Sequence, residues 1–167
     1  MGELTHFDYS GASHMVDVGH KPTTRRRAVA SATVTMEPAT LELLARGGHK
    51  KGDVREVARL AGIMAAKRTG DLIPLCHPLP IDSVAVQFSK VDERRLRIEA
   101  EVTTTGKTGV EMEALTAAST AALTVYDMVK SVDRGVVVER LQLEHKSGGK
   151  TGEWNRTRDE AGTKDLA

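Results

Sequence analysis

The chain has 167 residues, with 24 Lys and Arg against 23 Asp and Glu, a formal net charge of +1 and a single cysteine. This length fits one domain with a real core, and the balanced charge excludes a global positive field that would draw the protein to nucleic acid. One cysteine excludes an internal disulfide framework and fits a reducing compartment.

The N-terminus shows no targeting signal. No basic segment leads into an apolar run, and position 6 is His where a myristoylation signal requires Ser or Thr. The longest weakly polar stretch, residues 114–126, is too short and too rich in Thr and Ser to span a bilayer. We therefore expect a cytoplasmic protein.

The first half of the chain predicts a strand and two helices. Apolar residues alternate over residues 27–36, as in a half-buried strand. Pro38 fits the first turn of a short helix, and Asp53 can cap a second helix over residues 54–69. The expected core face of the strand consists of Ala28, Ala30, Ala32, Val34 and Met36. The expected apolar residues of the two helices are Leu41, Leu43 and Leu44, then Val54, Val57, Ala58, Ala61, Met64 and Ala65.

The second half predicts a hairpin, a long helix and a last strand. The hairpin pairs residues 83–91 with 95–103, the helix covers 109–132, and the strand follows Gly135. With the extra helix left aside, the order is β-α-β-β-α-β. It predicts an α+β, ferredoxin-like fold, an antiparallel sheet with helices packed on one face. We expect a single domain over residues 1–153 and a flexible C-terminal tail over 154–167.

Two glycine-lysine loops follow predicted strands. TTTGKTG, residues 103–109, is not a nucleotide-binding P-loop, because that motif requires a glycine where Glu101 stands. Two interpretations remain, an anion site with free amides and a simple helix-capping turn. A second loop, HKSGGKTG at residues 145–152, favours phosphate binding.

The long helix has two different faces. The core face is expected to hold Leu115, Ala118, Ala122, Val125 and Val129. The opposite face carries Glu113, Thr116, Thr120, Thr124 and Asp127, with Lys130 at its edge. This second face is either solvated or packed against another surface. In the packed case Asp127 and Lys130 would lie in partly buried surroundings, where a lysine can be tuned toward proton transfer.

Glu113 and Asp127 are far apart on that helix. Fourteen residues correspond to about 21 Å along a helix axis, more than a small substrate spans. If both side chains serve one site, two copies of the chain must share it. Among the basic clusters, Lys51 is the strongest candidate for an anion contact, because Gly52 and Asp53 beside it begin a helix.

The stretch DLIPLCHPLP, residues 71–80, places the single cysteine beside a histidine and between prolines. A zinc site requires four ligands with recognisable spacing, and the Cys76-His77 pair has no such partners. Adjacent residues of an extended segment point to opposite sides, so the pair is also a poor nucleophile and base. We interpret Cys76 as pocket wall and His77 as the side chain that a rigid loop presents to a substrate.

Five blocks of the sequence are long and specific. They are SHMVDV (13–18), HKKGDV (49–54), AAKRTGDLIPLCHPL (65–79), TGKTGVEMEALTAASTAALTVYDMVK (105–130) and KSGGKTG (146–152). Together they resemble the molybdenum cofactor biosynthesis protein C family. The resemblance implies that a 3',8-cyclised dihydroguanosine triphosphate is rearranged to cyclic pyranopterin monophosphate with release of diphosphate, a lyase reaction. It implies no redox cofactor, and it leaves open whether magnesium accompanies the triphosphate.

The resemblance also implies roles for particular residues. Asp127 matches a catalytic aspartate with Lys130 as its partner, and Lys51 is placed like a catalytic lysine. The substrate-contacting segments are matched by Leu75, Cys76 and His77 and by Met112 and Glu113. Arg26, Lys67 and Lys146 are our hypothetical phosphate contacts. The resemblance further implies assembly as a trimer of dimers, a homohexamer with sites at dimer interfaces. Such sites agree with the separation of about 21 Å between Glu113 and Asp127, which requires two copies of the chain to share one site.

A binding module is the rival interpretation, since the same fold class also serves as effector-binding domains and RNA-binding platforms. RNA binding is disfavoured, because Phe88 is the only aromatic residue on the inner strands and the net charge is +1. A module that binds an effector would not need the Asp127 and Lys130 pair.

Overall fold

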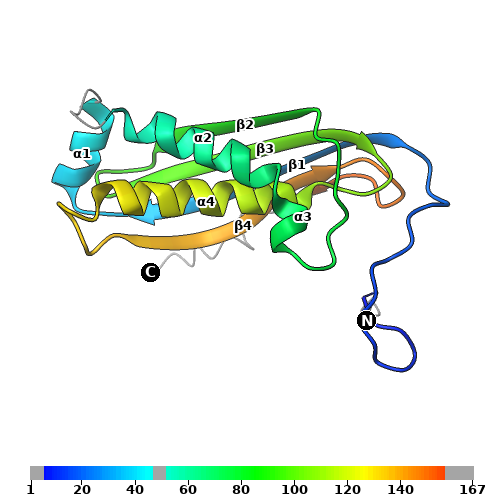
Figure 1. Cartoon of the computed structure of the whole chain (residues 1–167). Helices are drawn as coiled ribbons and strands as arrows, with labels where there is room; N and C mark the ends of the chain where they lie inside the picture. Colours follow the sequence, from blue (N-terminus) through cyan, green and yellow to red (C-terminus); the bar gives the residue numbers. More distant parts are fainter. Residues whose placement is uncertain (1–5, 47–51, 157–167) are drawn as a thin grey trace, which may run out of the picture.

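The computed structural model describes residues 6–46 and 52–156. Within these residues one antiparallel sheet has the strand order β2-β3-β1-β4-β5 (Figure 1). The strands are β1 (Thr24–Thr35), β2 (Ser83–Lys90), β3 (Arg95–Gly106), β4 (Val137–Ser147) and β5 (Trp154–Asn155). The helices are α1 (Pro38–Arg46), α2 (Val54–Ala66), α3 (Thr69–Leu72) and α4 (Glu111–Val129).

The helices cover one face of the sheet. Helix α4 lies across β1, β3 and β4, and α2 packs beside it over β2 (Figure 1). The α+β fold with an antiparallel sheet is therefore confirmed, as is the order of its main elements. None of the helices in the described ranges combines the length and the apolar character that crossing a bilayer requires.

The alternation in β1 directs its small residues toward the helices. All five predicted core residues of this strand are buried, and so are Ala118, Ala122, Val125 and Val129 of α4. Small side chains let the helix layer approach closely. A Cβ added at Gly62 of α2 would lie 2.9 Å from the carbonyl oxygen of Ala117, so the contact between α2 and α4 requires glycine there.

Some local predictions were wrong. Leu43, Val57 and Met64, expected inside, are exposed, because only part of each helix stripe faces the sheet. Helix α2 ends at Ala66, and Thr69 begins the separate helix α3. The predicted tail also starts too early, since Trp154 and Asn155 pair with β4 as β5. The remainder of that tail, from residue 157, lies outside the described residues.

Candidate active site

Two adjoining pockets lie at the end of the sheet where β1 and α4 begin. The larger, here called the mixed pocket, has a volume of about 640 Å³ and both apolar and ionisable walls. It is lined by His6, Val16, Val18, Lys21, Ile73, Pro74, Leu75, Cys76, His77, Leu79, Thr108, Gly109, Glu111, Met112 and Glu113. The structure thus brings together Leu75, Cys76, His77, Met112 and Glu113, the two segments that the sequence analysis paired.

The Pro-rich loop is fastened at both ends. At its start, Gly70 of α3 packs against Pro78, where an added Cβ would lie 3.5 Å from the proline Cα. The Cys76 amide donates to the Ile73 carbonyl oxygen at 3.0 Å and closes a turn. At its end, the Thr104 hydroxyl donates to the Pro80 carbonyl oxygen at 2.5 Å. Helix α3 and strand β3 therefore fix the wall that carries His77.

Glu113 is 3% exposed in the first turn of α4. Burial, with a smaller contribution from the charge of Glu111, raises the pKa of the Glu113 carboxyl above its ordinary value. Burial and the same two carboxylates raise the pKa of the Cys76 thiol. A thiol held in its neutral form is a poor nucleophile, which agrees with the interpretation of Cys76 as wall.

The second cavity, here called the basic pocket, has a volume of about 320 Å³. It is lined by Lys21, Arg26, Arg27, Lys107, Thr108, Gly109, Glu111, Lys146, Ser147, Gly148, Lys150 and Thr151. Both glycine-lysine loops contribute to it, and six of its side chains are basic against one acidic. Lys21, Thr108, Gly109 and Glu111 line both pockets, so the two cavities form one continuous site.

Arg26 lies between the two glycine-lysine loops. Its Nη2 donates to the Lys107 carbonyl oxygen at 3.2 Å, while its Nε is buried with no hydrogen-bond partner among the described residues. A buried donor without a partner is costly, so a ligand oxygen would satisfy it. The predicted phosphate contacts Arg26 and Lys146 both line this pocket.

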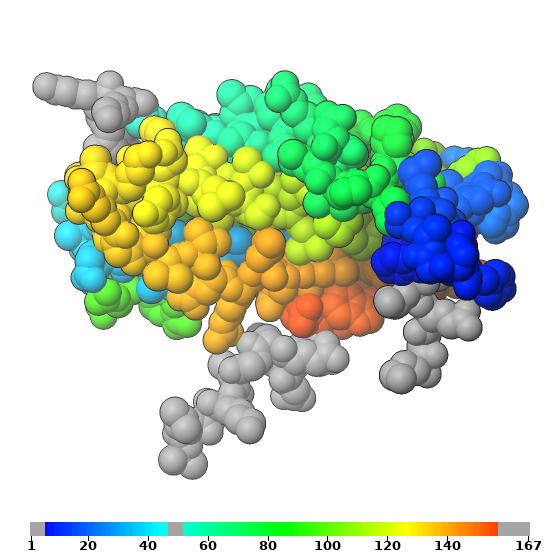
Figure 2. Space-filling model, turned by 60° about the horizontal axis from the view of Figure 1, so that its bottom comes forward, coloured from blue at the N-terminus to red at the C-terminus, as the bar shows by residue number. Residues whose placement is uncertain are grey.

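An arm of residues 6–21 forms the outer wall of the mixed pocket. Lys107 ties this arm to the site by donating from Nζ to the Gly19 carbonyl oxygen at 2.6 Å. In Figure 2 the arm (blue) lies beside the segment that follows α3 (green). The sequence blocks pointed to residues 13–18, but His6 and Lys21 were not assigned to the site.

Glu111 is a further site residue that the sequence analysis missed. Its carboxylate lies 3.1 Å from Lys146 Nζ and lines both pockets. The available signal was its position two residues before Glu113, on the first turn of the same helix. Glu111 therefore places a carboxylate, paired with Lys146, at the junction of the pockets.

One predicted phosphate contact lies elsewhere. Lys67 lines a small hollow of about 80 Å³ behind Glu113 and does not reach the basic pocket. Lys51 lies outside the described residues. For Lys67 the physical reason is its place just after α2, on the far side of the Pro-rich loop.

Asp127 and Lys130 are not part of either pocket. They form an ion pair of 2.5 Å in the last turn of α4, with side chains 66% and 56% exposed. In the single chain this pair is therefore solvated, and the packed alternative, which requires another surface, stays a prediction. The carboxylate raises the pKa of the Lys130 ammonium, the opposite of tuning toward proton transfer.

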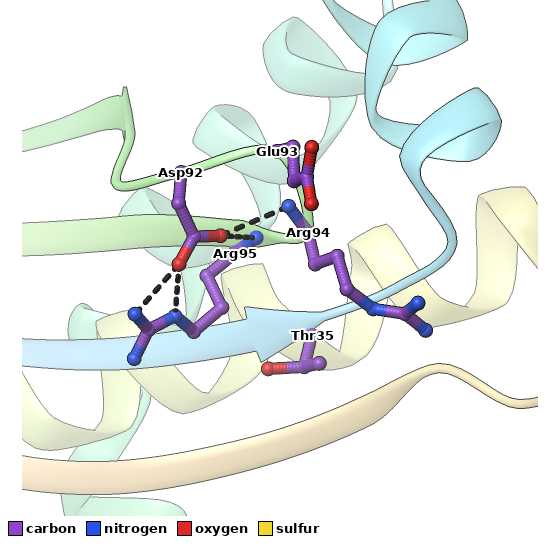
Figure 3. Close-up of a pocket in the computed structure, with 5 residues that line it drawn as sticks. All are labelled: Thr35, Asp92, Glu93, Arg94 and Arg95. Atoms are coloured by element: carbon purple, nitrogen blue, oxygen red, sulfur yellow. Dashed lines mark hydrogen bonds and ion pairs between the residues drawn. The ribbon is translucent and has the colours of Figure 1, made fainter.

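A further hollow of about 440 Å³ lies at the other end of the sheet, at the β2-β3 turn. Figure 3 shows the Asp92 carboxylate accepting from the backbone amides of Arg94 and Arg95 and from the Arg95 guanidinium. The Arg94 guanidinium points away and pairs with Glu37 at 2.7 Å. The opposite charges in this hollow neutralise one another, so we interpret it as a turn stabilised by ion pairs.

Residues 6–46 and 52–156 contain no group of three or more His, Cys, Asp or Glu side chains placed to hold a metal ion. His77, Glu111 and Glu113 line the mixed pocket as polar groups.

A basic cavity joined to a cavity of mixed polarity, on the helix-covered sheet of an α+β domain, defines a small-molecule site. The chain belongs to the MoaC family, whose model matches residues 15–149. The resemblance stated from the sequence blocks is thereby confirmed.

Similar relatives are named cyclic pyranopterin monophosphate synthase. The protein of Thermomicrobium roseum is 57% identical over 162 residues, 96% of this chain and 98% of the relative. That of Pelotomaculum thermopropionicum is 57% identical over 164 residues, 98% of this chain and 96% of the relative. That of Herpetosiphon aurantiacus is 58% identical over 152 residues, 90% of this chain and 93% of the relative.

Proposed function

We propose that this protein is a cyclic pyranopterin monophosphate synthase. It converts (8S)-3',8-cyclo-7,8-dihydroguanosine 5'-triphosphate to cyclic pyranopterin monophosphate and releases diphosphate, an early step of molybdenum cofactor biosynthesis. We assign it to the lyases, because diphosphate departs without hydrolysis. The observation that carries this proposal is the junction of the mixed and basic pockets, in a chain whose relatives bear that enzyme's name.

The two pockets suit the two halves of this substrate. A triphosphate chain requires several cations, and the basic pocket offers Lys21, Arg26, Lys107, Lys146 and Lys150. The fused ring system requires apolar walls with a few polar groups, which the mixed pocket supplies. In this arrangement Lys21 and Glu111 lie where the ring joins the phosphates.

Acid-base groups beside the ring pocket are needed to open and reclose the purine-derived ring. His77 lines the mixed pocket, and we assign it to proton transfer or to orienting the substrate. Lys51, which lies outside the described residues, is proposed as a second catalytic group. Asp127 and Lys130 complete the set, supplied by another copy of the chain.

Sharing between copies follows from the length of α4. Glu113 and Asp127 stand at opposite ends of this helix, about 21 Å apart. An antiparallel pairing of two α4 helices would bring each Asp127 to the partner's mixed pocket. Exposed apolar side chains on the helix layer support self-association, with Leu60 and Leu123 62% and 60% exposed. We propose a homohexamer built as a trimer of dimers, with the sites at the dimer interface.

We propose that the reaction uses no redox cofactor and takes place in the cytoplasm. Magnesium can accompany the triphosphate as its counterion, bound by phosphate oxygens rather than by a cage of protein ligands. The balanced charge and the pocket geometry support a small-molecule partner, with neither nucleic acid nor membrane as a partner.

The test is to incubate the purified oligomer with the cyclised guanosine triphosphate and to measure diphosphate release, with and without magnesium. Release coupled to formation of cyclic pyranopterin monophosphate is expected. An intact oligomer that releases no diphosphate under either condition would overturn the enzyme assignment. GTP serves as the matched control, because it carries the same triphosphate without the cyclised ring.

A further inference from the structure

The loop between β4 and β5, residues 148–153, forms one wall of the basic pocket through Gly148, Lys150 and Thr151. Gly148 and Gly149 adopt the left-handed conformation, with φ of 98° and 75°. A Cβ at Gly148 would lie 2.2 Å from the Arg25 carbonyl oxygen, and one at Gly149 would lie 1.6 Å from Arg26 Nη1. The loop therefore lies directly on β1 and covers the guanidinium that has an unpaired buried nitrogen.

Strand β5 alone cannot hold this loop in place. It consists of Trp154 and Asn155, which pair with Lys146 and His145 of β4. A pairing of two residues at a sheet edge is only marginally stable. Further contacts must therefore fix the loop where it meets Arg26.

Arg156 supplies three contacts that fasten the end of this hairpin. Its backbone amide donates to the Glu144 carbonyl oxygen at 2.9 Å, and its Nε donates to the Leu143 carbonyl oxygen at 2.7 Å. Its guanidinium also lies over the Trp154 ring, 5.5 Å from the ring centroid. One side chain thus joins β4 to the residue that follows β5.

A second set of contacts lies on the other side of the hairpin. Asn155 Nδ2 donates to the Glu153 carboxylate at 2.9 Å, so Asn155 Oδ1 is left to accept from His145 Nδ1 at 2.7 Å. The His145 and Asn155 side chains therefore reinforce a backbone pairing that exists in β5 already.

We propose that Arg156 is a positioning residue, which clamps the β4-β5 hairpin and so preorganises the 148–153 loop for binding a phosphate chain. The residue does not touch the ligand. Without the clamp, the loop becomes ordered only when the ligand binds. The entropic cost of ordering it then reduces the binding free energy and weakens the affinity. Because binding and clamping are thermodynamically linked, a bound phosphate chain should in turn stabilise the clamped hairpin. The identity of the ligand rests on the proposed function, and the clamp itself rests on the contacts above.

The experiment uses inorganic triphosphate as its probe and the full-length oligomer. Calorimetric titration should show wild-type protein binding it, and Arg156→Ala binding about tenfold more weakly, equivalent to about 1.4 kcal/mol. Arg156→Lys should recover part of this loss, since an ammonium can donate to the Leu143 carbonyl and lie over the ring. Lys90→Ala, at an exposed position near the opposite end of the sheet, is the matched control and should bind like wild type.

Trp154 is the single tryptophan of the chain and reports directly on the hairpin. In Arg156→Ala its emission should shift to longer wavelength as the ring becomes solvated, and saturating triphosphate should reverse part of the shift. A purely structural role would produce the shift without the reversal, which would overturn the proposal. So would equal affinities for wild type and Arg156→Ala, or no triphosphate binding by wild type. If Arg156→Ala does not fold, Arg156→Lys carries the same test.

The kinetic outcome separates this proposal from the proposed function. The clamp predicts a higher KM for the cyclised triphosphate in Arg156→Ala with kcat nearly unchanged. The reason is that the lost interaction stabilises the bound substrate and the transition state equally. Triphosphate binding that depends on Arg156, in a protein that releases no diphosphate, would remove the enzyme assignment and keep the clamp. Full activity with an unchanged KM in Arg156→Ala would do the reverse.

Discussion

The two ends of α4 present their charges in opposite ways. At the first turn, Glu113 is buried in a pocket whose walls come from the N-terminal arm, the Pro-rich loop and the turn after β3. At the last turn, Asp127 and Lys130 form an exposed ion pair that belongs to no pocket. The first end of the helix therefore lines a pocket formed within a single chain, and we call it the built end. The last turn lines neither pocket of the site.

This difference shows what a functional side chain requires from its surroundings. An exposed ion pair is screened by water and contributes little, whereas a desolvated carboxyl has a strongly altered proton affinity. If Asp127 and Lys130 act chemically, another surface must exclude water from them.

The largest effect is expected at the built end. His77→Ala should lower kcat by about 10²–10⁴-fold, the usual contribution of a positioned acid or base. Cys76→Ser should keep most of the activity, because the neutral thiol only lines the wall. Steady-state diphosphate release measures both. Equal losses in the two variants would show that the loop's packing matters, and not the imidazole.

Complementation compares the two ends directly. Asp127→Ala and Glu113→Ala should each be inactive as pure oligomers. Co-expressed with different tags and purified as a mixture, they should recover about a quarter of wild-type activity, since half of random dimers pair the two variants and contain one intact site. Activity that stays at background would eliminate the shared site.

A smaller effect is expected in the basic pocket. Lys146→Ala removes a cation and leaves the Glu111 carboxylate facing the phosphates unpaired. KM for the triphosphate substrate should rise by about tenfold, close to the lower end of the range for a hydrogen bond to a charged group. Initial-rate kinetics at several substrate concentrations measure it, with Lys90→Ala as the exposed control. An unchanged KM would place the phosphates elsewhere.

Much of the fold could be predicted from the sequence, because period-2 and helical patterns report burial directly. Ala28 to Met36 and the core face of α4 show this. The wrong local predictions share one cause. Val57 and Met64 are apolar and lie on the correct helix, but a pattern cannot distinguish the side that faces the sheet from a side that faces solvent or another chain.

The candidate site was predictable only in part. Cys76, His77, Met112 and Glu113 were grouped through sequence blocks, and the structure brings them into one pocket. Glu111 and Lys107 were missed as particular site residues, because their roles depend on where β3, β4 and the N-terminal arm meet. That meeting is a tertiary contact between distant segments, and it leaves no local pattern in the sequence.

The smallest effect concerns the stability of the built end. Burial raises the pKa of Glu113 above its ordinary value of 4.5, so the folded protein holds this proton at a pH where the unfolded chain has lost it. The stability contributed by the protonated form is fully present below the unfolded pKa. It is lost as pH rises through the folded pKa, because the carboxylate must then be buried.

Glu113→Gln tests this directly, since the amide resembles the protonated carboxyl and does not titrate. Free energies of unfolding, measured by urea denaturation across the pH range, should diverge as pH rises, with the variant more stable than wild type at neutral pH. Below the ordinary pKa of glutamate the difference should become constant, which serves as the internal control. Parallel profiles at all pH values would mean that a partner or solvent compensates the charge of Glu113, and the contrast between the ends of α4 would then rest on geometry alone.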